Sequence, residues 1–222
     1  MNKKSLILVL LLTGVTASAT AQVYTTVPTY TPIKKQYFGF AWNVAWPTGT
    51  TRDFIDKTSY SGFSVEGRSH TTPNIMLGGF LGWNYFYQVK TDPVTIDQPE
   101  VGGTVSGTQE RFINSIPLLF TAAYDLGEGN DKVQPFVSLG IGATYYLQRW
   151  GIGVATLEQR TWHLTLMPEA GAYISFDERG TTALFLSARY LLGFDADTDV
   201  LGRDDNQITY FMLGVGLMFS PF

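Results

Sequence analysis

The stretch YFGFAWNVAW, residues 37–46, decides the fold of this 222-residue chain. Its bulky apolar side chains alternate strictly with small or polar ones. A period of two residues is typical of a β-strand, whose successive side chains point to opposite faces. One face is broad and apolar, whereas the other carries glycine, alanine and asparagine. Such a strand suits a barrel whose outer surface meets lipid. The bulky residues are Phe38, Phe40, Trp42, Val44 and Trp46.

The same alternation returns seven times along the chain, and the connections are long and short in turn. We predict an all-β fold, an eight-stranded antiparallel transmembrane β-barrel with short periplasmic turns and longer extracellular loops. The expected strands are 36–46, 62–69, 75–89, 109–124, 133–148, 161–176, 182–194 and 207–219. The long loops are 47–61, 90–108, 149–160 and 195–206, and the turns are 70–74, 125–132 and 177–181.

The beginning of the chain has the pattern of a secretory signal peptide. Lys3 and Lys4 precede an apolar core at 5–15, and Ala19, Thr20 and Ala21 form an A-x-A motif that places cleavage before Gln22. An uncleaved anchor is the alternative, but this core is too short to cross about 30 Å as a helix. We therefore predict a signal peptide at 1–21, an extended lead-in at 22–35 and a barrel domain at 36–222.

Composition narrows the classes of partner and chemistry. The formal net charge is −4, and it falls to about −6 once Lys3 and Lys4 are removed, so we expect no nucleic-acid partner. The chain has no cysteine, which excludes disulfides, a thiol nucleophile and a lipid-modified N-terminal cysteine. The barrel must be held together by its hydrogen-bond ladder and its packing.

Several short motifs resemble a known family. They are IPLL at 116–119, PFVSLGIGATYY at 135–146, PEAG at 168–171 and GVGLMF at 214–219. Together they resemble the outer-membrane β-barrel domain family, the small porin-like relatives of OmpA and OmpX. The resemblance covers nearly all of the mature chain and specifies a fold, not an activity. It implies the outer membrane of a Gram-negative bacterium, with outer-membrane lipid and lipopolysaccharide as partners and help from the barrel-assembly machinery and periplasmic chaperones.

The end of the chain departs from the pattern of that family. Many such barrels finish on a phenylalanine in phase with the outward face. Here Phe222 is out of phase with Phe219, and Pro221 lies between them. The sequence leaves two candidates for the terminal assembly signal.

Aromatic residues on the apolar face gather toward the strand ends. Two girdles of amphipathic rings are expected where a barrel meets the two headgroup layers. With the first strand running outward, the outer girdle comprises Trp46, Tyr85, Tyr87, Trp162 and Phe194, and the periplasmic girdle comprises Phe38, Tyr124, Phe176 and Phe219.

The opposite face of the strands carries charge that would lie inside the barrel. Eight strands enclose a lumen just wide enough for side chains, and unpaired charges there would be very costly. We predict that these charges pair as a structural plug. The alternative is a gate in a narrow porin or small-solute channel. The residues are Glu66, Arg68, Arg111, Glu169 and Arg189.

Signals for a cofactor, a metal or catalysis are weak. Gly140 and Gly142 lack the third glycine of a phosphate loop and lie in mid-strand. The acidic run at 195–199 starts like a Ca²⁺ loop, but Val200 and Asn206 occupy positions that require Gly and Glu. Only His70 and His163 could serve as a histidine base. We predict no cofactor, no metal and no catalytic residue, and a lipid A-modifying enzyme is the less favoured alternative.

The sequence thus favours a non-enzymatic envelope protein, with a structural role or binding of an unknown extracellular ligand by its loops. A lipocalin-like soluble barrel would place the bulky faces inside and overfill a small lumen. The loop residues expected to make contacts are Phe54, Ile55, Trp150 and the acidic run from Asp195.

Overall fold

The computed structural model describes residues 36–91, 94–96, 103–105, 108–127, 132–152, 155–176, 181–194 and 207–220. The predicted signal peptide at 1–21 and the lead-in at 22–35 lie outside the described residues. The same holds for the acidic run at 195–199 and for Phe222.

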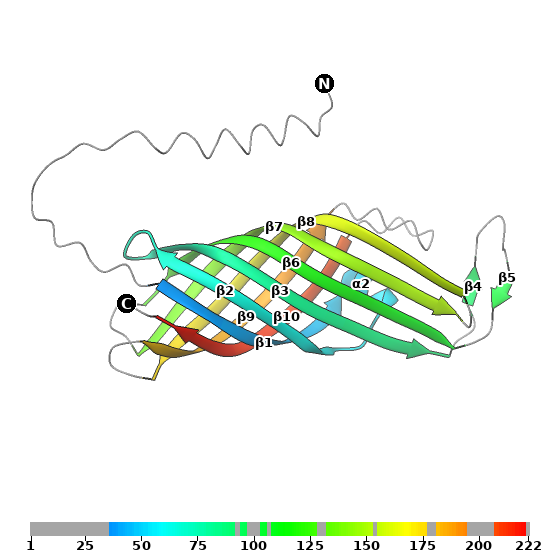
Figure 1. Cartoon of the computed structure of the whole chain (residues 1–222), viewed down its shortest axis with the longest axis horizontal. Coiled ribbons are helices and arrows are strands. Elements are labelled where there is room, and N and C mark those ends of the chain that lie inside the picture. Colours follow the sequence, from blue (N-terminus) through cyan, green and yellow to red (C-terminus); the bar gives the residue numbers. More distant parts are fainter. Residues whose placement is uncertain are drawn as a thin grey trace, which may run out of the picture. The chain divides into compact units, whose positions relative to one another are not determined.

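Eight long strands close into one antiparallel barrel, which confirms the predicted fold class (Figure 1). The order around the barrel is β1-β10-β9-β8-β7-β6-β3-β2, so each long strand pairs with its neighbour in the chain and the first pairs with the last. Closure leaves no sheet edge for another chain to pair with along the wall. The bounds are β1 Gln36–Thr48, β2 Ser59–His70, β3 Ile75–Lys90, β6 Gln109–Asp125, β7 Val133–Ile152, β8 Ala155–Ser175, β9 Thr182–Phe194 and β10 Gln207–Phe219.

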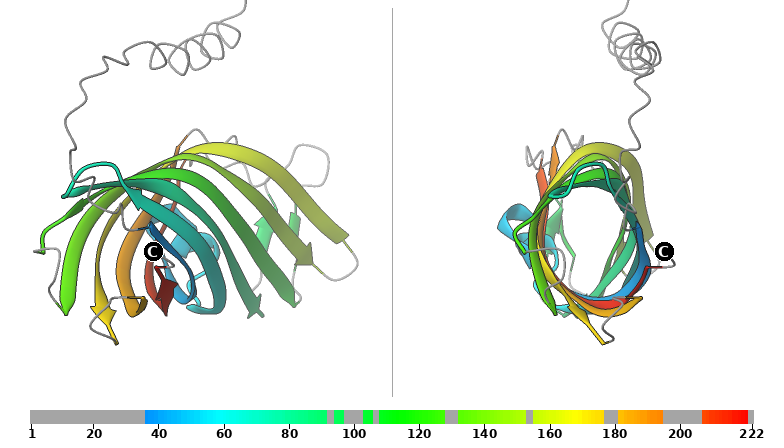
Figure 2. Two further views of the ribbon diagram at one scale, coloured as in Figure 1. Left: turned by 60° about the vertical axis from the view of Figure 1, so that its left-hand side comes forward. Right: turned by 90° about the vertical axis from the view of Figure 1, so that its left-hand side faces the viewer.

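Strand β1 shows how alternating residues are divided between the lumen and the outer wall. In β1, Phe38 and Trp42 are 60% and 53% exposed on the outer wall, whereas Ala41 and Asn43 are buried inside. The strand closes the barrel against β10, with Phe38 opposite Phe219. Large apolar side chains cover the outside, whereas the inside combines buried polar and charged residues with buried rings and aliphatic side chains. The apolar outer wall is therefore what departs from the arrangement of a soluble protein. The view along the barrel in Figure 2 shows the closed ring of strands.

We call the two ends of the barrel the turn end, where β1 begins and β10 ends, and the loop end, where β1 gives way to α2. The loop end differs most from the prediction. The expected loop at 149–160 is wrong, because β7 and β8 continue as a paired hairpin, with Gln148 opposite Gln159 and Ile152 opposite Ala155. Outward positions there are charged, as at Arg149 and Glu158, so the apolar alternation that marks a lipid-facing strand stops before the strand does.

Two other connections contain short elements. The segment after β1 forms α2, Gly49–Phe54, which begins at Gly49 with a positive φ of 51°. The connection between β3 and β6 contains a separate two-stranded sheet of β4, Val94–Ile96, and β5, Gly103–Val105. Neither was expected, since six and three residues are too few to show a period. None of the helical residues described forms a segment long and apolar enough to span a bilayer.

Candidate functional site

Four charged side chains meet inside the barrel and form what we call the charge tetrad: Glu66, Arg68, Glu169 and Arg189. Glu66 and Arg68 lie two residues apart on β2 and therefore share its inward face. Glu169 of β8 and Arg189 of β9 lie opposite each other in register. All four side chains are completely buried. Residues from three strands are thus brought to one level of the lumen.

The tetrad alternates in charge, so that each carboxylate lies between two guanidinium groups. Arg68 Nη2 donates to Glu66 Oε2 at 2.8 Å and to Glu169 Oε2 at 2.5 Å. Arg189 Nε donates to Glu169 Oε1 at 2.8 Å, and Arg189 Nη2 donates to Glu66 Oε1. The formal charge sums to zero. Buried ions are tolerable only in such a paired and hydrogen-bonded arrangement.

Rings and small residues complete the packing around the tetrad. The guanidinium of Arg68 lies 4.6 Å from the ring centre of Phe136, and that of Arg189 lies 4.8 Å from that of Phe80. Gly214 makes room on β10, where a Cβ would come within 3.3 Å of Arg189 Nη1 and 2.7 Å of Ser187 Oγ. The absence of a side chain at Gly214 therefore leaves room for the Arg189 guanidinium.

The lumen is also filled on the turn-end side of the tetrad. Tyr37 stacks on Tyr173 with ring centres 4.8 Å apart, and Phe136 lies 4.8 Å from Tyr173 in turn. Tyr37 Oη donates to Gln134 Oε1 at 3.0 Å. These rings are almost wholly buried, so they close the barrel between the tetrad and the turn end.

A third layer fills the loop end, and Arg111 belongs to it instead of to the tetrad. Arg111 donates to the carbonyl of Phe54 and to Gln109 Oε1, both at 2.8 Å, and lies over the rings of Phe54 and Trp150. The predicted cluster of five charges is therefore a tetrad plus one arginine beside α2. Alternation fixed the face on which Arg111 lies, but it carries no information about depth in the barrel.

The apolar loop residues expected to make external contacts are buried inside the loop end of the barrel. Phe54 and Trp150 are 6% exposed and Ile55 is fully buried. They pack with Ile113 and Tyr146 in one apolar cluster. The prediction of external contacts is therefore wrong for these three residues, whereas the acidic run from Asp195 lies outside the described residues. An apolar side chain beside an open barrel mouth gains more from filling the mouth than from facing water.

The residues predicted as girdles lie on the outer wall at both ends of the strands. At the loop end, Tyr87 packs against Phe112 at 4.8 Å and Trp162 against Tyr145 at 5.3 Å. At the turn end, Phe38 and Phe219 face each other across β1 and β10. The highest exposed fractions among the nine are those of Trp162, Phe176 and Phe38, at 65%, 62% and 60%.

The two histidines lie at opposite ends of the barrel. His70 Nε2 lies 3.5 Å from Asp125 Oδ2 near the turn end. The ring of His163 packs 5.0 Å from that of Tyr146, and its Nε2 lies 2.7 Å from Thr161 Oγ1. Within the part of the chain that the structure describes, no three His, Asp or Glu side chains converge as metal ligands.

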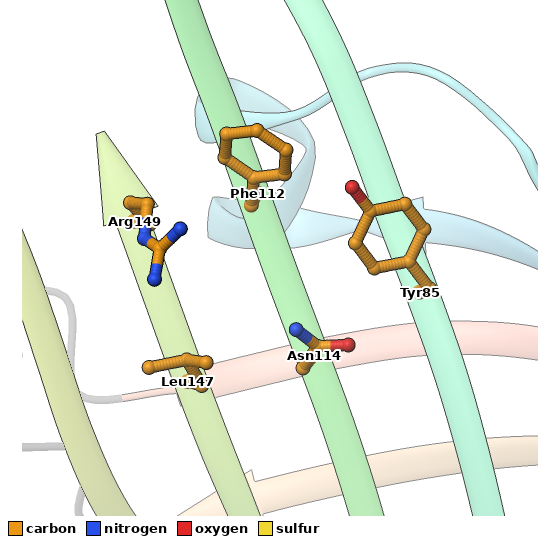
Figure 3. Close-up of a pocket in the computed structure, with 5 residues that line it drawn as sticks. All are labelled: Tyr85, Phe112, Asn114, Leu147 and Arg149. Atoms are coloured by element: carbon orange, nitrogen blue, oxygen red, sulfur yellow. The ribbon is translucent and has the colours of Figure 1, made fainter. Parts of the chain in front are cut away.

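A pocket of about 130 Å³ opens on the outer wall near the loop end (Figure 3). It is lined by Tyr85 of β3, Phe112 and Asn114 of β6, and Leu147 and Arg149 of β7. No local pattern in the sequence indicates this pocket, because its walls come from three strands and only the register of the sheet brings them together.

A charged group that we call the hairpin triad borders this pocket: Arg149, Glu158 and Arg160. Glu158 Oε2 accepts from Arg149 Nη2 at 2.7 Å, and Glu158 Oε1 accepts from Arg160 Nε at 2.7 Å. These hydrogen bonds, that of Arg149 first, lower the pKa of the Glu158 carboxyl below its ordinary value. Glu158 therefore remains anionic in mildly acidic solution, and the triad keeps a formal charge of +1.

Comparisons with known proteins show the fold. No protein-family model matches the chain, and no curated protein matches it either. Among solved structures, Neisserial surface protein A matches with a TM-score of 0.51 at 12% identity, over 83% of this chain and 96% of that one. The resemblance to small outer-membrane barrels is thus confirmed at the level of the fold.

Two other solved structures are similar at lower scores. Ail, the attachment invasion locus protein of Yersinia pestis, crystallised with the heparin analogue sucrose octasulfate, matches at 14% identity with a TM-score of 0.45, over 84% of this chain and 97% of that one. OprG of Pseudomonas aeruginosa matches at 10% identity with a TM-score of 0.46, over 84% and 95%.

Proposed function

We propose that this chain, which has the fold of the small outer-membrane barrels, is a non-enzymatic integral protein of the Gram-negative outer membrane with a closed lumen and a structural role in the envelope. The observation that carries the proposal is the charge tetrad. A neutral, fully buried set of ion pairs is suited to seal a barrel and unsuited to pass solute.

The outer wall supports the location. Phe40, Leu118 and Ile141 lie on three different strands and are each about half exposed. Each of the other five long strands also exposes at least one large apolar residue, among them Phe63, Leu81, Leu164, Leu186 and Leu213. An exposed apolar surface that continues around a closed barrel requires a lipid solvent. Export would use the predicted signal peptide at 1–21, with the barrel-assembly machinery inserting the mature chain.

The packing on both sides of the tetrad supports a plug over a gate. A gate needs space into which a charged side chain can swing when its ion pair breaks. Here the stacked rings of Tyr37 and Tyr173 close one side, and Phe54 and Ile55 help to close the other. Moving an arginine would therefore require several rings to move, and the close packing of protein interiors opposes such movement.

The test is conductance of the purified protein in planar lipid bilayers. We expect no stable wide channel from the wild-type protein. The variant Arg189→Ala removes one side of the tetrad and is expected to give larger or more frequent current steps, whereas Arg52→Ala, on the exposed face of α2, should behave as the wild type does. Steady solute-permeable conductance in the wild-type protein would overturn the plug and favour the narrow porin.

Binding of an extracellular ligand by the loops is the second role that the sequence predicts. Its acidic run at 195–199 lies outside the described residues, and the apolar candidates Phe54 and Trp150 are buried. A deletion strain separates the two roles. A structural role predicts envelope stress and detergent sensitivity, whereas a binding role predicts a loss of adhesion with an intact permeability barrier.

A further inference from the structure

The outer-wall pocket combines apolar walls with polar groups at one end. Tyr85, Phe112 and Leu147 supply ring and methyl surface, and all three lie on the side of the sheet that faces away from the lumen. Asn114 Oδ1 accepts from Trp83 Nε1 at 3.3 Å. Figure 3 shows the Asn114 nitrogen on the side of the pocket where Arg149 lies. A donor and a cation thus border an apolar hollow.

The hairpin triad brings a formal charge of +1 to this border, beside the Glu110 carboxylate, which lies two residues from Phe112 on the outward face of β6 and interacts electrostatically with Tyr85. Its two guanidinium groups share a single carboxylate, that of Glu158. The side chains of Arg149 and Arg160 are 45% and 67% exposed, so each has donor surface in reach of a second anion. The Arg149 guanidinium also lies 6.0 Å from the ring centre of Phe112, which places the charge directly above the apolar wall.

The position of the pocket along the barrel wall agrees with the binding of an anion next to an apolar chain. Arg149 pairs in register with Phe112 on one side and with Glu158 on the other. Arg160 is two residues from Trp162 on the same outward face and one step closer to the tip of the hairpin. Arg149 shares a register row with the girdle residue Tyr87 through Phe112, and Arg160 lies just beyond Trp162. The triad therefore lies at the level of the aromatic girdle, where lipid headgroups begin, while the hollow extends toward the acyl chains.

We propose that this pocket is a binding site for a phosphorylated, acylated lipid of the outer leaflet. An acyl chain lies between Tyr85, Phe112 and Leu147, and the phosphate accepts hydrogen bonds from Arg149 and Arg160. Guanidinium groups bind phosphate well because their donors match its oxygens. The proposal rests on the proposed membrane location and adds a specific lipid site to it.

The test compares lipid A with lipid A lacking both phosphates, each offered to the full-length barrel in nanodiscs of phosphatidylcholine, with retained lipid counted by native mass spectrometry. We expect the phosphorylated form to be retained more strongly. Arg149→Gln and Arg160→Gln should each reduce this preference by about fivefold, the contribution expected for one basic residue at a membrane surface. Arg52→Gln, which removes an exposed arginine elsewhere at the loop end, is the matched control and should change nothing.

Two further variants separate the parts of the site. Glu158→Gln raises the charge of the triad from +1 to +2 and should increase retention of the phosphorylated lipid. Leu147→Trp fills the hollow and should reduce retention of both lipids, whereas Leu139→Trp, on the outward face of the same strand but nearer the turn end, should not.

The possible failures are distinguishable. The heat-dependent gel shift of each variant in nanodiscs reports folding in lipid, so a wild-type protein that fails to insert contradicts the proposed function itself. Normal insertion with equal retention of the two lipid A forms overturns the lipid site alone. If Arg52→Gln and Arg149→Gln reduced the preference for phosphorylated lipid A equally, the lipid site would also be overturned, since equal reductions would indicate a general effect of net charge.

Discussion

At the scale of single residues, the tetrad makes a sharp prediction about stability. Arg189→Met keeps most of the side-chain volume but leaves Glu66 and Glu169 with one shared cation. Removing one partner of a buried ion pair costs about 3–5 kcal/mol, because the remaining charge stays buried without compensation. The free energy of unfolding in lipid vesicles, measured by urea titration of tryptophan fluorescence, should fall by that amount.

The control for this prediction replaces the whole tetrad by apolar residues of similar volume, as in Glu66→Leu, Arg68→Met, Glu169→Leu and Arg189→Met combined. Such replacements of complete buried ion networks are often neutral or stabilising. The quadruple variant should therefore be more stable than Arg189→Met alone. If the quadruple variant instead lost as much unfolding free energy as the four single variants lose in sum, each ion pair would stabilise the barrel independently.

At the scale of elements, Glu158 links the two strands of the β7–β8 hairpin, because it accepts from Arg149 across the hairpin and from Arg160 on its own strand. Because the pKa of Glu158 is lowered in the folded protein, its stabilisation is present above the ordinary carboxyl pKa and is lost as the pH falls through the lowered value. Glu158→Gln should therefore speed amide hydrogen exchange at 148–152 and 155–160 at neutral pH, with no change in β1. In acid, where the wild-type carboxyl is protonated, the two proteins should exchange alike. A difference that persists there would contradict this account.

The same hairpin shows what the sequence could and could not predict. Where strands cross lipid, most outward residues are apolar, as at Leu213 and Leu186, and this alternation located β9 and β10 to the residue. Beyond the lipid, outward residues need not be apolar. The charged residues Arg149 and Glu158 therefore gave the sequence of this hairpin the appearance of a loop. The sequence predicted the face of the strand on which Arg111 lies. It did not predict the position of Arg111 along the barrel axis, because strand tilt and register decide that position. The outer-wall pocket needs the register of β3, β6 and β7 together, which no local pattern contains.

At the scale of the whole molecule, a barrel with a lipid-facing outer wall should lose stability when an outward residue is replaced by a charged one. The loss should depend on how deep that residue lies in the bilayer. Ile141 lies in mid-strand on the outer wall, between Phe120 and Leu166 in register, whereas Tyr87 lies at the loop-end girdle. An arginine on the lipid face costs about 2–4 kcal/mol at the bilayer midplane and about 0–1 kcal/mol near the interface. Ile141→Arg should therefore reduce the free energy of unfolding in vesicles far more than Tyr87→Arg, as measured by urea titration. In a water-soluble barrel both positions would face solvent, and both substitutions would be tolerated equally. Equal and small effects would thus contradict the membrane location, whatever the lumen and the lipid site do.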